Sequence, residues 1–237
     1  VFFVAFVGML NNAFMKIMFF SRNYQLGQDA IDRLEDIFAK MEKNKLESGS
    51  IEKMDSYDIE FENVGFKYEE GVNVLSDFNL KLEAGKVYAL VGSSGSGKST
   101  IAKLISGFYP VSSGQLKIGG RDIKEYTSKV LERNVAFVFQ KSKLFKTSIY
   151  ENVRLARPES SHEEVMRALD MAMCSSILDK FETREETIIG ANGVHLSGGE
   201  MQRIAVARAI LKDAPIVILD EASAASDPEN EYEMQRA

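Results

Sequence analysis

A glycine-rich run constrains the fold of this chain more than any other stretch: Gly92-Ser93-Ser94-Gly95-Ser96-Gly97-Lys98-Ser99-Thr100. It fits the pattern G-x-x-x-x-G-K-[ST] and lies between an apolar run, 87–91, that suits a strand and a run, 101–105, that suits a helix. Glycines in such a loop let successive backbone N–H groups and the helix start point at one anion. Lys98 then reaches the β- and γ-phosphates, and the Ser99 hydroxyl takes a coordination position on Mg²⁺. The run predicts a phosphate-binding loop, with a flexible Gly/Ser linker as the alternative.

The composition limits what else the chain does. Its 237 residues suffice for one α/β domain plus a smaller part. A formal net charge of −6 argues against a protein that grips nucleic acid by neutralising phosphates. The single cysteine, Cys174, excludes an internal disulfide, and with two histidines a His/Cys metal site is disfavoured. Because the neighbours of Cys174 are apolar, we expect a buried thiol.

The first twenty residues predict a transmembrane helix. Only Asn11, Asn12 and Lys16 are polar there, and a helix of this length covers about 30 Å, the thickness of a bilayer core. The basic residues Lys16 and Arg22 follow the apolar stretch, unlike those of a signal peptide, and they place the following part in the cytoplasm. A buried core helix is the alternative. We expect the chain to be a piece of a longer protein.

The helical pattern continues beyond the apolar stretch. Apolar residues at helical spacing form one face, opposite acidic and basic ones: Ala30, Leu34, Ile37, Phe38 and Met41. We therefore assign residues 1–43 to the transmembrane helix and its cytosolic extension. The polar stretch 44–57 is interpreted as a linker, and 58–237 as the nucleotide domain.

An antiparallel pair of strands is expected at the start of that domain. Residues 59–68 broadly alternate between apolar and polar, a turn follows at 69–71, and 74–82 reads as the next strand. Tyr68 then lies in a loop, where its ring either stacks on an adenine or packs in the hairpin core.

Two further strands end in polar side chains that suit a nucleotide site. Ile216–Leu219 is a continuous apolar run, typical of a central parallel strand, and Asp220 and Glu221 follow it. Asp220 is predicted to hold Mg²⁺ and Glu221 to deprotonate a water, unless both are plain strand caps. Gln140, after the apolar run 135–139, is placed to sense the γ-phosphate, Mg²⁺ or the lytic water.

A second helix start of the anion-binding kind comes late in the chain, at Leu196-Ser197-Gly198-Gly199-Glu200. Ser197 and two glycines open a helix whose later residues are mostly apolar. Because one domain has no need of two such sites for one nucleotide, we expect the second to serve a nucleotide held by a partner copy.

In combination, these motifs resemble the ATP-binding-cassette (ABC) family from about residue 57 to the end of the chain. The glycine-rich run looks like the Walker A loop, Gln140 the Q-loop glutamine, and 196–200 the signature. Residues 216–221 look like the Walker B strand with its catalytic glutamate, and Asp227 like the D-loop aspartate. Tyr68 matches the adenine-stacking position, and residues 1–43 resemble the last membrane helix of an exporter-type half-transporter.

The resemblance implies a fold and a set of partners. The fold is an α/β P-loop NTPase: a RecA-like cassette with a parallel sheet, an antiparallel edge sheet and a helical subdomain, preceded by one transmembrane helix. It implies ATP and Mg²⁺ as cofactors and a second cassette as partner, in a homodimer or heterodimer. It also implies the parent's own membrane domain in a lipid bilayer, such as a bacterial inner membrane, with no nucleic acid. It further implies that ATP binding brings the two cassettes together and that hydrolysis of ATP lets them return to their starting arrangement. Glu221 is then the catalytic residue that activates water, supported by Lys98, Gln140 and Asp220.

Several positions depart from the family pattern. Glu200 stands where the signature usually ends in Gln, and we expect its charge near a partner's phosphates to weaken ATP binding. Ala191 replaces a glutamate that contacts the membrane domain, and the D-loop reads Ala224-Ala225-Ser226-Asp227. The switch histidine would follow Ala237. These departures leave open a regulatory cassette that does not hydrolyse ATP.

A chromosome-maintenance ATPase of the same superfamily is the other alternative. Its cassette is split by a long coiled coil, whereas only residues 141–195 separate Gln140 from the signature.

Overall fold

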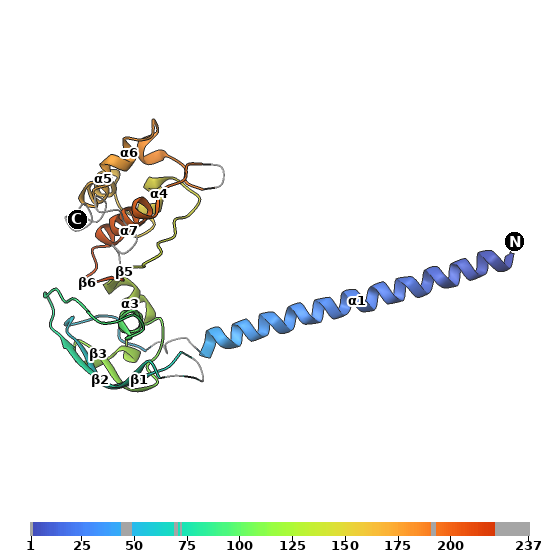
Figure 1. Cartoon of the computed structure of the whole chain (residues 1–237), viewed down its shortest axis with the longest axis horizontal. Helices are drawn as coiled ribbons and strands as arrows, with labels where there is room; N and C mark the ends of the chain where they lie inside the picture. The colour runs from blue at the N-terminus through green and yellow to red at the C-terminus, as the bar shows by residue number, and fades with distance from the viewer. Residues whose placement is uncertain (1, 44–48, 69–70, 72, 191–192, 221–237) are drawn as a thin grey trace. The chain divides into compact units, whose positions relative to one another are not determined.

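The computed structural model describes residues 2–43, 49–68, 71, 73–190 and 193–220 (Figure 1). The chain divides into two compact units, residues 1–45 and 46–237.

The first unit is a single helix, α1 (Phe2–Lys43). Asn11 and Asn12 do not interrupt it, and the apolar face expected around Leu34 and Phe38 is exposed. No helix in the described ranges combines the length and the apolar content that crossing a membrane requires. The expected transmembrane helix is therefore present as a helix but does not meet the requirements for a span.

The second unit begins with an antiparallel sheet in the order β2-β1-β3-β4. Its strands are β1 (Ile59–Phe66), β2 (Leu75–Leu82), β3 (Ser113–Ile118) and β4 (Arg121–Asp122). Phe61 of β1 pairs with Leu80 on one side and Leu116 on the other, and its side chain is 1% exposed. The expected antiparallel edge sheet is confirmed, because alternate apolar residues of β1 face one core.

Two strands form a parallel pair, β5 (Val135–Val138) and β6 (Ile216–Leu219), in register from Val135↔Ile216 to Val138↔Leu219. The expected strand at 87–91 is wrong: this segment has no ladder, and Val87 and Val91 are fully exposed. A strand needs a neighbour for its backbone groups, and among the described residues none pairs with it. The expected central position of β6 is also not met among the described residues, because β5 is the one strand paired with it and Val217 is 55% exposed.

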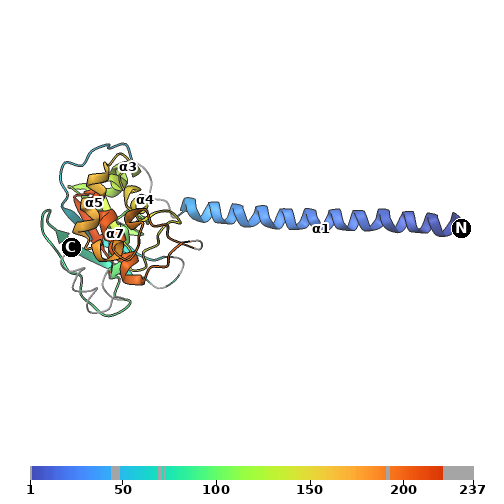
Figure 2. The ribbon, with the colours of Figure 1, turned by 90° about the horizontal axis from the view of Figure 1, so that it is seen from above.

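The helical subdomain expected between Gln140 and the signature is confirmed. It contains α4 (Ile149–Arg154), α5 (His162–Met171), α6 (Ser175–Leu178) and the short η2 (Arg184–Glu186), and α7 (Gly198–Lys212), which starts within the signature, packs against α4 and α5. Helices α4, α5 and α7 lie together in both views (Figures 1 and 2) and enclose their own apolar core. Cys174 is buried in that core, as expected.

The remaining elements precede β5 in the sequence, one between β2 and β3 and two between β4 and β5. They are α2 (Lys98–Ile105), η1 (Ile123–Glu125) and α3 (Ser128–Asn134). Part of the expected linker bonds to this region, since the backbone N–H of Gly49 donates to Tyr126 O at 3.0 Å and that of Ile51 to Glu125 O at 2.9 Å. Met54, also in the expected linker, is buried in the core of the sheet.

Candidate functional site

The phosphate-binding loop has the backbone that its glycines predict. Gly95 and Gly97 both have positive φ, +81° and +93°, a region that favours glycine. Gly97 caps α2, and a Cβ added to it would lie 3.0 Å from Leu75 Cδ2. The loop therefore reaches the start of α2 in a backbone conformation that would be strained for any residue other than glycine.

Lys98, the first residue of α2, folds back across this loop. Its Nζ donates to the carbonyl oxygens of Gly92 and Ser93, both at 2.9 Å. An ammonium group has three donors, so one is left for an anion at the loop. Lys98 Nζ therefore lies at the phosphate-binding loop, and its contact with the phosphates stays a prediction.

Ser99 and Asp220 meet although they are far apart in the sequence. The Ser99 hydroxyl donates to Asp220 Oδ1 at 2.7 Å. Asp220 follows β6, and its backbone N–H donates to Val138 O of β5 at 3.0 Å, which fixes its position. A hydroxyl and a carboxylate are hard oxygen ligands of the kind that Mg²⁺ binds, usually with one or two carboxylates and phosphate oxygens. No cluster of three or more His, Cys, Asp or Glu is found in the described ranges.

Tyr68 is tied to the helix that follows the loop. Its hydroxyl lies 3.0 Å from Thr100 Oγ1, and Lys103 Nζ lies 5.7 Å from its ring centroid. Edge contacts with Phe66 and Tyr109 fix the ring, which remains 38% exposed. The aromatic side chain expected at the adenine therefore makes a polar contact with α2, the helix whose first residue is Lys98.

The remaining candidates are Gln140, Glu221, Asp227 and Ala191. Gln140 is exposed just beyond the end of β5. Glu221, Asp227 and Ala191 lie outside the described residues, so their roles stay predictions.

The signature forms the start of α7, as expected. Ser197 is the N-cap: its hydroxyl accepts from the Glu200 backbone N–H at 3.3 Å, while Glu200 Oε2 accepts from the Ser197 N–H at 2.7 Å. This reciprocal pair is a capping box. Leu196 is half-buried, Gly199 is buried, and Gly198 is exposed with open space around its Cα. The helix start is thus accessible at Gly198.

The charge of Glu200 has a partner within its own chain, and the expected weakening of ATP binding stays a prediction. Glu200 is 7% exposed, and its Oε1 accepts a hydrogen bond from Lys180 Nζ at 2.7 Å. Burial would raise the pKa of Glu200, but the hydrogen bonds from Lys180 and the Ser197 N–H hold it below its usual range. The carboxylate is therefore ionised and paired within its own chain.

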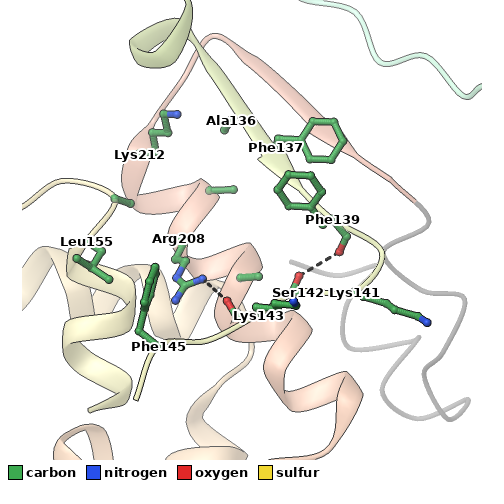
Figure 3. A pocket seen from close by; sticks show the side chains of 13 residues that line it. Ala136, Phe137, Phe139, Lys141, Ser142, Lys143, Phe145, Leu155, Arg208 and Lys212 are labelled. Atoms are coloured by element: carbon green, nitrogen blue, oxygen red, sulfur yellow. Dashed lines mark hydrogen bonds between the residues drawn. The ribbon is translucent and has the colours of Figure 1, made fainter. Parts of the chain in front are cut away.

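A cavity of about 550 Å³ is lined by residues of β5, of the segment 139–145 and of α7 (Figure 3). Arg208 of α7 lines this cavity. Its Nε donates to Asn152 O at 2.7 Å, and one of its NH groups donates to Lys143 O at 2.9 Å. Its guanidinium lies 5.6 Å from the Phe145 ring centroid. Burial lowers the pKa of Arg208. This residue joins the segment after Gln140 to the signature helix, a role that sequence reasoning missed; its signal was an arginine within the mostly apolar run of α7.

The comparisons with known proteins agree with this geometry. A family model described as ABC transporter matches residues 75–224. The ATP-dependent lipid A-core flippases of Escherichia coli K12 and Shigella flexneri are each 44% identical over 216 residues, which is 90% of this chain and 37% of theirs. The chain thus spans just over a third of the length of these relatives.

A solved structure described as a bacterial Atm1-family ABC exporter with ATP bound is also similar. It superimposes with a TM-score of 0.73 at 34% identity, covering 79% of this chain and 33% of its own. Sequence, fold and site geometry agree: the chain belongs to the ABC transporter family.

Proposed function

We propose that this chain is the ATP-binding and hydrolysing part of an exporter-type ABC transporter. It would use ATP to drive two cassettes together and so power export across a membrane. The observation that carries the proposal is the 2.7 Å contact of Ser99 with Asp220, because it joins the phosphate loop to the strand that precedes Glu221. The similarity to the flippases and to the Atm1-family exporter supports the exporter type.

Each residue has one task in this proposal. Lys98 and the backbone N–H groups of the loop hold the phosphates, Tyr68 stacks on the adenine, and Ser99 and Asp220 hold Mg²⁺. When bound, Mg²⁺ neutralises charge on the phosphate oxygens. Glu221 accepts the proton of the attacking water, and Gln140 orients it.

The partners and location follow from the same proposal. The signature around Ser197 and Gly198 serves a second cassette, so each nucleotide is held between two copies. The parent protein carries a membrane domain in the lipid bilayer, and the cassette faces the cytoplasm. A lipid-linked cargo is the first class to test, because the matched relatives are named lipid A-core flippases.

The test uses the full-length protein in lipid vesicles, with ATP binding and phosphate release both measured. Lys98→Ala should abolish ATP binding, whereas Glu221→Gln should keep binding and stop turnover, since only the proton acceptor is lost. Wild-type turnover by the glutamine variant would refute the role of Glu221. Binding without turnover in the wild type would instead support the regulatory cassette.

A further inference from the structure

The signature glutamate uses both of its carboxylate oxygens within its own chain. Oε2 accepts from the Ser197 backbone N–H at 2.7 Å, and Oε1 accepts from Lys180 Nζ at 2.7 Å. Lys180 reaches it from the turn after α6, so the pair joins two segments of the helical subdomain. Glu200 thereby has one fixed orientation, turned back onto the start of its own helix.

This orientation matters because of where the charge lies. The start of α7, a helix of 15 residues, carries a partial positive charge that attracts anions. An ionised Glu200 at the third helical position would offset that charge and repel a phosphate. Lys180 places a positive charge 2.7 Å from the carboxylate and opposes this repulsion, although its own side chain is 58% exposed.

We propose that Lys180 is a positioning residue for the signature of this chain. By holding Glu200 in the capping box, it keeps Ser197 and Gly198 in place and presents a helix start without net negative charge to the nucleotide of a second copy. The inference rests on the proposed function, because it needs the nucleotide between two copies.

If the ion pair between Lys180 and Glu200 has only a structural role, we expect a different result. If the pair only joins α6 to α7, losing Lys180 lowers the melting temperature and leaves the KM for ATP alone. If Lys180 acts through Glu200, its loss raises that KM, and the effect depends on whether residue 200 carries a charge.

The experiment is a double-mutant cycle in the full-length protein, with KM, kcat and the melting temperature measured for each variant. Lys180→Met should raise the KM for ATP about three- to tenfold, the range for a charged hydrogen bond discounted for its exposed partner. Lys180→Arg should restore the KM to within about twofold, because it keeps the charge. In a Glu200→Gln background, the effect of Lys180→Met should shrink by at least about threefold.

Arg167→Met is the matched control, because it removes the cation of an exposed ion pair with Glu163 in the same subdomain. We expect it to leave the KM unchanged. An equal effect of Lys180→Met in both backgrounds, or a lower melting temperature with unchanged KM, would overturn the inference alone. Absence of Mg²⁺-dependent ATP binding by the wild type would overturn the proposed function, and the inference with it.

Discussion

The hydroxyl of Ser99 donates a 2.7 Å hydrogen bond to Oδ1 of Asp220. Ser99 belongs to the first turn of α2, and Asp220 follows β6 directly, so the bond joins a helix start to the end of a parallel strand. Ligand sites in α/β proteins lie at the carboxyl ends of such strands. The contact therefore brings together the two side chains that we propose as Mg²⁺ ligands, although they lie far apart in the sequence.

Removing either partner of this contact should weaken Mg²⁺ binding. Asp220→Asn removes a charged ligand and Ser99→Ala a neutral one, so we expect the aspartate change to have the larger effect. The Mg²⁺ concentration for half-maximal ATP hydrolysis should rise roughly 10- to 100-fold for Asp220→Asn, the range for lost metal-site interactions.

Ser106→Ala is the control for this measurement. Ser106 lies at the other end of α2 and donates to Ala102 O at 3.0 Å, so the change removes a hydroxyl of similar environment. An unchanged Mg²⁺ requirement in Asp220→Asn would contradict the assignment.

A second prediction separates the ring of Tyr68 from its hydroxyl. Tyr68→Ala removes a stacking surface worth about 1–3 kcal/mol for a base, so the KM for ATP should rise roughly 5- to 150-fold. Tyr68→Phe keeps the ring and loses only the contact with Thr100, so we expect a change of about twofold. Titration with ATP measures both, and Tyr109→Phe is the control because its ring packs against Tyr68. Equal effects of the alanine and phenylalanine changes would refute stacking.

The sequence predicts those parts of the site that depend on local pattern. The loop at Gly97, the helix start at Ser197 and the strand at 216–219 follow from residues adjacent in the chain. The predictions that the structure overturns depend on contacts between segments that are far apart in the sequence. The strand expected at 87–91 requires a pairing partner, which no local pattern supplies.

The environment of Glu200 was missed for the same reason. Its charge is visible in the sequence, but its compensation is not, because Lys180 reaches it only after the helices have packed. The same holds for Arg208, whose partners Lys143 and Asn152 lie on other segments. Pairings of this kind are set by tertiary packing and not by spacing along the chain.

A third prediction concerns the stability that Arg208 provides. Arg208→Met leaves the carbonyl oxygens of Asn152 and Lys143 without this donor, so the free energy of unfolding should fall by about 1–3 kcal/mol. Arg208→Lys should be nearly as damaging, because a single ammonium does not reproduce the planar set of donors. Chemical unfolding of the full-length protein measures both changes.

Lys141→Met is the control for Arg208, since Lys141 lines the same cavity but is exposed. We expect it to change the free energy of unfolding by less than about 0.5 kcal/mol. Full retention of stability by Arg208→Lys would contradict the role assigned to the planar guanidinium.

The last prediction follows from the lowered pKa of Glu200. Burial opposes ionisation, but the hydrogen bonds from Lys180 and Ser197 outweigh it, so the folded state holds the carboxylate ionised more strongly than the unfolded chain does. The resulting stability is present above the ordinary glutamate pKa of about 4.3 and is lost as the pH falls through the lower folded value. The wild type should thus lose melting temperature below about pH 4 more steeply than Glu200→Gln, in which nothing titrates at this position. Glu163→Gln, at an exposed site on α5, is the control, and parallel pH profiles for wild type and Glu200→Gln would contradict the assignment.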